Sequence, residues 1–466
     1  MSNPTSRRDF LKLATLGMAG ISMSAAAAKR ARAEILQPPA RSKQVSPNDR
    51  IRLATIGMGI IGFVDTETAL EVPGVELVAA ADCYDSRLVH TREVFGKQVA
   101  TTRAHEEILE RPDVDAVIIS VPDHWHARIA MEAMKAGKAV YCEKPMVQDI
   151  EEGSQVIQTE RSTKQVFQVG SQYASSILYQ KARELYQSGA IGKLNLVEAR
   201  YNRNSSIGAW QYSIPPDASP KTIDWQRFLG NAPNRPFDPV RFFRWRNYWD
   251  YGTGIPGDLY VHLFTGIHTV LNSLGPTRIM ATGGLRFWQD GRDVPDIMVG
   301  MCGYEETEAH PEFTLSLQTN FEDGSGGGSS FRFIGDEGAL EVTYDAVTLT
   351  RSPRRGPGAD EVLRGYNSVR TWSEQTQQAF AREWRAGHSR PVDPPMDEST
   401  TYRAPEGYDD RFDHLTYFFD SVREGKPVYE DSVFGFRAAA PALLTNTAYR
   451  QNRIVSWDPE KMRIVS

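Results

Sequence analysis

Several short runs of the chain carry side chains that could move a proton. Cys142-Glu143-Lys144-Pro145 offers an amine, and Asp258 precedes His262 by four residues in a segment of helical pattern. Residues four apart on a helix lie on one face, so this carboxylate and this imidazole can meet. Lysine in a partly dry cleft and histidine are both used for proton transfer. The residue types predict acid–base chemistry, with Lys144, Asp258 and His262 as candidate catalytic residues.

Each of these residues also has a plainer interpretation. Asp258 follows Pro256-Gly257 and could cap the helix N-terminus, which would leave His262 in solvent. Lys144 could be an ordinary surface lysine. The helix predicted from residue 259 to residue 274 has one apolar face, and the polar stripe opposite it consists of Asp258, His262, Thr265 and Thr269.

A glycine motif directly follows the apolar run Ile51–Ile56. Its form is G-x-G-x-x-G, in which the first glycine permits a tight turn, the second admits a pyrophosphate and the third lets the following helix pack closely. The helix N-terminus supplies partial positive charge for the phosphates. The motif predicts a dinucleotide site made of Gly57, Met58, Gly59, Ile60, Ile61 and Gly62.

Asp82 lies 20 residues after the last of these glycines, at the end of the second apolar run. A carboxylate at this place bonds the hydroxyls of the adenine ribose and repels a 2′-phosphate. The sequence therefore predicts NAD as the cofactor, with NADP less favoured. The alternative is a glycine-rich turn followed by a solvated aspartate.

Two further polar runs follow later strands. Val121-Pro122-Asp123-His124-Trp125-His126 follows one, and the run around Lys144 follows the next. Ligands of open α/β sheets bind at the carboxyl ends of the strands. We therefore expect Pro122, Asp123, His126, Glu143 and Lys144 near the cofactor, although His126 could instead cap the helix that it begins.

These motifs together resemble those of the Gfo/Idh/MocA oxidoreductases. The resemblance extends over nearly the whole chain after residue 50, and it implies that Glu143 positions the cofactor, that Lys144 touches the reacting hydroxyl and that the bond to Pro145 is cis. It also implies that His262 is the general acid or base and that Asp258 orients it or binds substrate. Gln172 is a further candidate cofactor contact.

The chain departs from the family pattern at three positions. Relatives often carry glycine and aspartate where this chain has Tyr260 and Thr265, and many exported relatives have arginine where it has Tyr173. Tyr173 is therefore a candidate substrate contact, and the specificity of a relative should not be transferred.

Aromatic and arginine side chains alternate between residues 241 and 251. Rings cover the apolar faces of sugars, and arginine, asparagine and aspartate bond their hydroxyls. We predict substrate contacts from Arg244, Trp245, Tyr248 and Trp249, in addition to Lys144, Asp258 and His262. The alternative is a lid or packing between domains.

The elements that must position these residues form an α/β protein. Strands alternate with helices in residues 51–170, which predicts a doubly wound parallel sheet, the Rossmann fold. Residues 171–466 predict an α+β domain with a large, open, mostly antiparallel sheet. Within it we expect a strand over 340–349, a hairpin loop at 324–328, a polar surface excursion over 351–408 and a last helix over 413–423.

Composition excludes several classes of protein. The 466 residues are 40% hydrophobic and 24% charged with net charge −6, which matches an ordinary soluble globular protein and argues against a nucleic-acid partner. Three scattered cysteines suit neither a disulfide framework nor a zinc ribbon, and we expect no metal. No later run is long enough to span a membrane.

The N-terminus resembles a twin-arginine export signal. Arg7-Arg8 precedes a weakly apolar run, and Ala31-Arg32-Ala33 fits a signal-peptidase site. We predict a signal over 1–33, an extended arm over 34–50 and a periplasmic protein; a membrane anchor is the alternative.

The sequence thus predicts an NAD-dependent oxidoreductase with a tightly held cofactor, acting on a hydroxyl of a sugar, polyol or glycoside. The second hypothesis is a redox-neutral, NAD-dependent enzyme that cleaves glycosides through a transient keto-sugar. The third is a non-catalytic sugar or dinucleotide sensor. Because relatives pair through the open sheet face, we also expect a homodimer or homotetramer.

Overall fold

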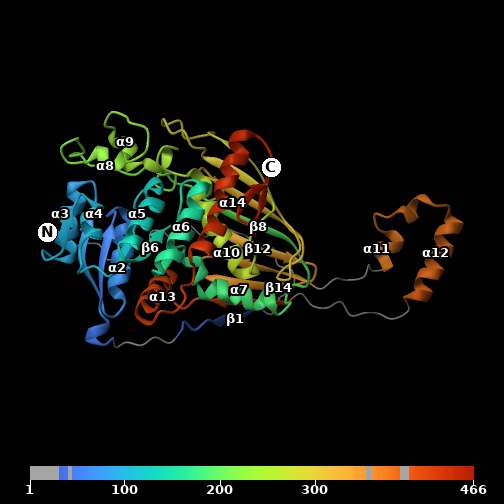
Figure 1. The fold of residues 1–466 in the computed structure, drawn as a ribbon. Coiled ribbons are helices and arrows are strands. Elements are labelled where there is room, and N and C mark those ends of the chain that lie inside the picture. Colours follow the sequence, from blue (N-terminus) through green and yellow to red (C-terminus); the bar gives the residue numbers. More distant parts are fainter. Residues whose placement is uncertain (1–30, 40–44, 353–358, 389–397, 466) are drawn as a thin grey trace, which may run out of the picture.

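The computed structural model describes residues 31–39, 45–352, 359–388 and 398–465, and it contains two sheets with helices between and around them (Figure 1). The predicted export signal lies outside these residues except for 31–33. Within the described parts of the chain, no helix is long and apolar enough to cross a membrane.

The first sheet is parallel and doubly wound, as predicted. Its six strands lie in the order β4-β3-β2-β5-β6-β7. The strands are β2 (Ile51–Ile56), β3 (Val75–Ala81), β4 (Ala100–Thr102), β5 (Ala116–Ile119), β6 (Ala139–Glu143) and β7 (Phe167–Gly170). They are rich in Val, Ile and Ala because helices cover both faces of the sheet. Those helices include α2 (Ile60–Glu71), α3 (Asp85–Phe95), α4 (His105–Leu109), α5 (Asp123–Lys135) and α6 (Ile150–Thr163).

The second sheet has eleven strands and is mostly antiparallel, also as predicted. Its order is β1-β15-β14-β13-β12-β8-β11-β10-β9-β16-β17, and only the pairs β1–β15 and β8–β11 are parallel. The strands are β1 (Ala31–Ile35), β8 (Leu194–Asn202), β9 (Arg278–Gly284), β10 (Ile297–Tyr304), β11 (Phe313–Asn320), β12 (Gly328–Gly335), β13 (Gly338–Val342), β14 (Ala346–Arg351), β15 (Glu398–Arg403), β16 (Val455–Asp458) and β17 (Arg463–Val465).

Two expectations for this sheet were wrong. The single strand expected over 340–349 is a hairpin of β13 and β14, which turns between Val342 and Ala346. The glycine-rich loop at 324–328 joins β11 to β12, but these strands are not paired, because β8 lies between them and bonds to both. The glycine-rich turn signal indicates that the two flanking strands are connected, but it cannot show that an earlier strand lies between them in the sheet.

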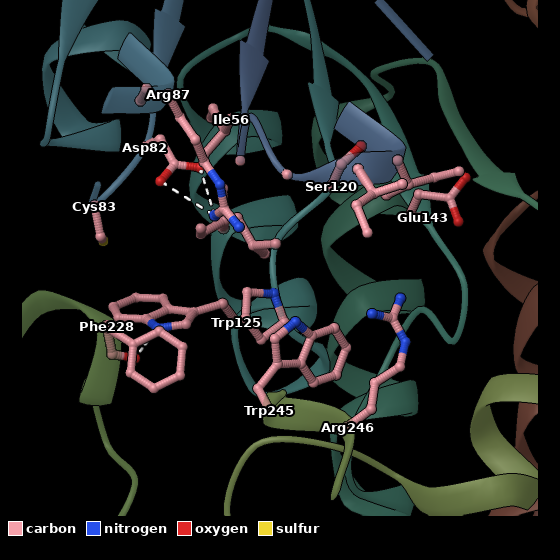
Figure 2. Close-up of a pocket in the computed structure, with 18 of the residues that line it drawn as sticks. Ile56, Asp82, Cys83, Arg87, Ser120, Trp125, Glu143, Phe228, Trp245 and Arg246 are labelled. Atoms are coloured by element: carbon pink, nitrogen blue, oxygen red, sulfur yellow. Dashed lines mark hydrogen bonds and ion pairs between the residues drawn. The ribbon is translucent and has the colours of Figure 1, made fainter. Parts of the chain in front are cut away.

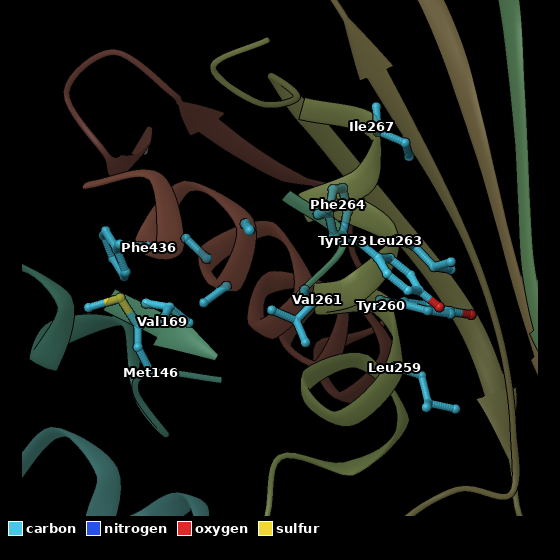
Figure 3. Packing of buried hydrophobic residues seen from close by; sticks show 14 of the residues in the cluster. Met146, Val169, Tyr173, Leu259, Tyr260, Val261, Leu263, Phe264, Ile267 and Phe436 are labelled. Carbon is cyan, nitrogen blue, oxygen red and sulfur yellow. The ribbon is translucent and has the colours of Figure 1, made fainter. Parts of the chain in front are cut away.

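The helices behind the large sheet include one that the sequence prediction omitted. The helix expected last is α13 (Asp410–Glu424), but α14 (Ser432–Gln451) follows it and packs on α10 (Val261–Leu271), α6 and β9. Pro441 lies inside α14, which hides the helix from a sequence prediction. Figure 3 shows Phe436 of α14 beside Met146 and Val169 of the first domain. This packing joins the two domains in one continuous core.

The N-terminal arm and the excursion are more ordered than predicted. Residues 31–35 form β1, which pairs in parallel with β15, so the arm is partly a sheet strand. A short 3-10 turn, η1 (Pro47–Asp49), ends it. The excursion contains α11 (Ala359–Arg364), η5 (Ser368–Thr371), α12 (Glu374–Gly387) and β15.

Candidate functional site

A cavity of about 350 Å³ lies along the carboxyl ends of β2, β3, β5 and β6 (Figure 2). The glycine loop and Asp82 border one end of it, and Lys144 and His262 border the other. Two regions far apart in sequence, the Rossmann domain and residues 201–262, form its opposite walls. This is the place at which an open α/β sheet binds its ligand.

The glycine loop has no room for a side chain at its first and last glycines, Gly57 and Gly62. Gly57 has φ +94°, and a Cβ there would meet the Ser120 carbonyl oxygen at 2.5 Å. A Cβ on Gly62 would meet the Gly57 carbonyl oxygen at 1.9 Å. Gly59 is the residue before α2, so the free backbone N–H groups of that helix point toward the cavity. The loop fits a pyrophosphate, as its spacing predicts.

Asp82 holds the loop and faces the cavity. Its Oδ2 accepts a hydrogen bond from the Met58 N–H at 2.8 Å, and its Oδ1 accepts one from the Tyr84 N–H at 2.8 Å. The Arg87 guanidinium lies 3.3 Å from Oδ2. Ile60 and Ile61 also line the cavity, whereas Met58 and Gly62 support it from behind.

At the other end of the cavity, Lys144 is bound to Asp258. The Lys144 Nζ donates to the Asp258 carbonyl oxygen at 2.8 Å and to its Oδ1 at 2.9 Å. The bond from Lys144 to Pro145 is cis, as the family resemblance implies. Two residues more than 100 positions apart thus form one buried ion pair, and both side chains are only 10–12% exposed.

Asp258 is the centre of a cluster of cations. Arg246 Nε lies 3.2 Å from Oδ1, Arg203 lies 3.8 Å from Oδ2, and the Trp210 indole N–H donates to Oδ2 at 3.2 Å. Burial alone would raise the pKa of Asp258, but Lys144, Arg246 and Arg203 hold it far below its ordinary value. The carboxylate is therefore ionised throughout the physiological range.

The local backbone explains why Asp258 meets Lys144. It lies in a π-helical turn, η4 (Pro256–Tyr260), directly before α10, and not at a capping position. A Cβ on Gly257 would collide with the Thr253 hydroxyl at 1.8 Å, so glycine is required beside it. Among the described residues, no hydrogen bond joins Asp258 to His262, although they are four apart. The added residue of a π turn shifts the side chains from the usual register.

His262 lines the cavity next to this cluster. Burial lowers its pKa well below 6.5, and Lys144 and Arg203 lower it further. Its Nδ1 is buried without a hydrogen-bond partner among the described residues. The Tyr173 ring lies 5.3 Å from the imidazole ring. His262 is therefore neutral at pH 7 and has a nitrogen available to accept a proton.

A second group of buried ionisable residues lies beside the first; it contains the predicted Glu143 together with Asp65 and Arg411, which the sequence analysis missed. Burial, with the carboxylate of Asp65, raises the pKa of Glu143 to about 8. The Arg411 guanidinium from α13 lies 3.2 Å from Asp65, and Ser120 donates to the same carboxyl group at 3.1 Å. Arg411, Ser120 and Glu143 line the cavity. No local motif marks Asp65 or Arg411, which come together only in the fold.

Two predicted cofactor contacts have structural partners instead. Asp123 is buried and accepts bonds from the N–H and the hydroxyl of Thr253, at 2.9 and 2.6 Å. Both ring nitrogens of His126 lie within hydrogen-bond distance of carbonyl oxygens, those of Pro145 and Val121, and the neutral ring donates to one of them. Neither lines the cavity, whereas Pro122 and Gln172 do. The polar side chains that follow β5 therefore bind neighbouring loops and do not point polar groups into the cavity.

The run of alternating aromatic and arginine residues, 241–251, also contains some residues that line the cavity and others that do not. Trp245 and Arg246 line the cavity, and Arg246 was not singled out from the sequence. Arg244 instead donates to the Tyr212 carbonyl oxygen at 2.8 Å. Tyr173, Tyr248 and Trp249 do not line the cavity.

Sequence models of one oxidoreductase family match both domains. Residues 51–171 match its NAD-binding Rossmann fold, and residues 198–279 match its C-terminal alpha/beta domain, both under the Gfo/Idh/MocA name. The first domain is therefore an NAD-binding domain.

Curated relatives match over part of the chain. A glycosyl hydrolase family 109 protein of Shewanella baltica is 33% identical over 170 residues, and an alpha-N-acetylgalactosaminidase of Shewanella oneidensis is 34% identical over 171 residues. Each match covers 34% of this chain and 37% of the relative's own length.

Solved structures match over most of the fold. Levoglucosan dehydrogenase in complex with NADH has a TM-score of 0.62 at 16% identity, covering 87% of this chain and 99% of that one. An oxidoreductase domain protein from Kribbella flavida has a TM-score of 0.63 at 16% identity, covering 87% and 98%. At such identities the likeness concerns the fold alone.

Proposed function

Because this chain belongs to the Gfo/Idh/MocA oxidoreductases, we propose that it is an NAD-dependent enzyme that acts on a hydroxyl of a sugar, polyol or glycoside and holds its cofactor tightly. The observation that carries the proposal is the reactive end of the cavity. There a lysine donor fixed by an ionised aspartate lies beside a neutral histidine whose Nδ1 has no hydrogen-bond partner among the described residues. These groups suit an alcohol that must lose a proton as it loses a hydride.

Each residue has a distinct part in this reaction. Bound NAD would supply the acceptor for the hydride that leaves the carbon bearing the hydroxyl. His262 takes the hydroxyl proton on a ring nitrogen, and burial keeps this base neutral near pH 7. The Lys144 ammonium donates a hydrogen bond to the substrate oxygen as negative charge develops on it. Asp258 holds that ammonium in place.

A redox-neutral glycosidase is the second candidate, and the glycosyl hydrolase family 109 relatives favour it. In this reaction a hydroxyl of the glycoside is oxidised transiently, so that a C–H bond beside the new ketone becomes acidic. The aglycone is eliminated, water adds, and the ketone is reduced again. The matched residues lie in about a third of each relative, so the activity of those proteins is a proposal for this one.

A panel of glycosides and free sugars separates the candidates. Each compound is scored for absorbance of reduced nicotinamide and for released aglycone, with Lys144→Met as the inactive control. Net oxidation of the sugar raises the absorbance of reduced nicotinamide and releases no aglycone. Redox-neutral cleavage releases aglycone without a net increase in reduced nicotinamide. Binding without either signal in the wild-type protein would leave only the sensor hypothesis.

We also propose that the protein is exported with NAD already bound. The twin arginines and the Ala31–Ala33 motif support an export signal, although residues 1–30 lie outside the described structure. Ala31–Ala33 belong to β1, so cleavage after Ala33 would remove most of that strand. Outside the cytoplasm no NAD pool replaces a lost cofactor. The intact mass of the exported protein gives the cleavage site.

A homo-oligomer formed through the outer face of the large sheet is the proposed assembly. Met280 and Met301 are neighbours on β9 and β10, and both are exposed there. Exposed apolar side chains on an open sheet favour association. Sedimentation at micromolar concentration tests this, and a monomer would reject it.

A further inference from the structure

Residues 211–252, here called the clasp, form the cavity wall that faces the Rossmann domain. The clasp contains α8 (Trp225–Leu229), α9 (Pro239–Phe243) and the short turn η3 (Trp245–Asn247). In Figure 1, α8 and α9 lie over α3, α4 and α5. In Figure 2, Phe228, Trp245 and Arg246 face Asp82, Ser120 and Glu143 across the cavity.

The clasp has a core of its own. Ile223, Trp225, Phe228, Phe242 and Tyr251 are buried together. The Phe228 ring stacks on Trp225 with centroids 5.1 Å apart and contacts Phe242 at 4.8 Å. Tyr84, which follows Asp82 by two residues, belongs to the same cluster. The clasp is therefore a packed unit, and one side of its core is supplied by the cofactor domain.

The clasp is bonded to the Rossmann domain just beyond Asp82. The Asp224 N–H donates to the Cys83 carbonyl oxygen at 2.8 Å, and the Asp85 N–H donates to the Thr222 carbonyl oxygen at 3.0 Å. This antiparallel bridge pairs Tyr84 with Ile223. It closes the cavity at the end where the adenosine of NAD belongs, because Asp82 marks the ribose position.

Two more contacts attach the clasp to the Rossmann domain, and they involve residues of α8 and the glycine that follows it. The Phe228 carbonyl oxygen accepts bonds from the Trp125 indole N–H and from the His124 ring, both at 2.9 Å. Gly230 has φ +53° and approaches Trp125 so closely that a Cβ would lie 2.5 Å from its ring. Arg227 forms an ion pair of 2.7 Å with Glu106 of α4.

The clasp also shapes the adenosine end of the cavity. The Arg87 guanidinium lies 5.5 Å from the Phe243 ring centroid and 5.6 Å from that of Phe242, while it pairs with Asp82. Guanidinium and aromatic planes of this kind stack on a purine. The two walls thus form a binding surface for adenine that neither makes alone.

We propose that the clasp covers the adenosine half of bound NAD and sets its rate of dissociation, so that NAD leaves only when the clasp opens. This rests on the proposed function for the retention of one cofactor through many turnovers. It goes further by assigning that retention to residues 211–252 and to their attachments at Cys83, Asp85, Trp125 and Glu106.

The test is the release of NADH from the full chain, followed by nicotinamide fluorescence during a chase with excess NAD. Ile223→Ala removes a buried side chain from the attachment, and Ile279→Ala, equally buried in β9, is the matched control. We expect Ile223→Ala to speed release about tenfold or more, equivalent to about 1.4 kcal/mol. The control should stay within about twofold.

A milder pair keeps the proposal testable if Ile223→Ala does not fold. Glu106 and Glu198 each bind one arginine and have similar exposure, 47% and 44%. Glu106→Gln should speed release about two- to threefold, as suits an exposed ion pair, and Glu198→Gln should not. Equal rates within each pair, or wild-type release complete within one desalting step, would overturn the proposal.

The release assay needs no sugar, so it separates this proposal from the proposed function. Slow release that the clasp variants accelerate would support the clasp even if no sugar were turned over. Turnover with clasp-independent release would support the enzyme and reject the clasp.

Discussion

Removal of the charge of Asp258 should destabilise the protein as well as inactivate it. In Asp258→Asn the amide keeps the size of the side chain, but three cations lose the one anion that they surround. The Asp258 side chain is only 12% exposed, so solvent replaces little of the lost interaction. Breaking a buried ion pair from one side costs about 3–5 kcal/mol. We expect the free energy of unfolding to fall by about 3 kcal/mol.

The assay is urea unfolding of the wild type and Asp258→Asn at several pH values. The folded pKa of Asp258 lies below its unfolded value of 3.8, so its stabilising contribution is complete above pH 3.8 and lost as pH falls through the folded pKa. The difference between the proteins should therefore be constant from about pH 5 to pH 8. A difference below about 1 kcal/mol would mean that solvent satisfies the cations, and it would refute the reasoning.

Three further predictions follow from the same site. Lys144→Met and His262→Ala should each lower turnover about 100-fold or more while NADH binding, measured by fluorescence, is kept; near-normal turnover would remove that residue from the mechanism. NAD should bind at least about tenfold tighter than NADP, and Asp82→Ser should narrow the gap in a titration; equal affinities in the wild type would reject the role of Asp82. The raised folded pKa of Glu143, about 8, predicts a stabilising contribution that is complete below its unfolded pKa and lost as pH rises to about 8. Glu143→Gln should flatten that loss in urea unfolding, and an unchanged slope would contradict it.

The cofactor half of the site could be predicted because its signals are local. Gly57 and Gly62 are required by close backbone approaches in the first loop of the sheet, and Asp82 directly follows the adjacent strand. The same logic did not foresee that Asp123 and His126 lie outside the cavity lining, since a polar residue after a strand can serve either a ligand or a neighbouring loop. Only the packing of Thr253 and Pro145 distinguishes these two uses.

The reactive half could be named from the sequence but not assembled. Lys144 and Asp258 were identified separately, yet their direct bond depends on a π turn that shifts the register of the helix start. Arg411 and Asp65, 346 positions apart in the sequence, leave no local pattern. The same limit hid α14, because its internal proline is a valid reason to end a helix unless tertiary packing compensates.

One group of charges acts on the protonation of both partners at the reactive end, in addition to burial, which is the largest cause of the lowered pKa of His262. Lys144 and Arg203 lower the pKa of Asp258, and they lower the pKa of His262 as well. The anion is thereby kept ionised and the imidazole neutral over the same pH range, so the site holds a positive donor and an uncharged base side by side. The proposed loss of a hydride and a proton from an alcohol would use this combination. A protonated His262 would add a fourth positive charge and have no lone pair to offer, so the cations that hold Asp258 also favour the neutral imidazole that the proposed base needs.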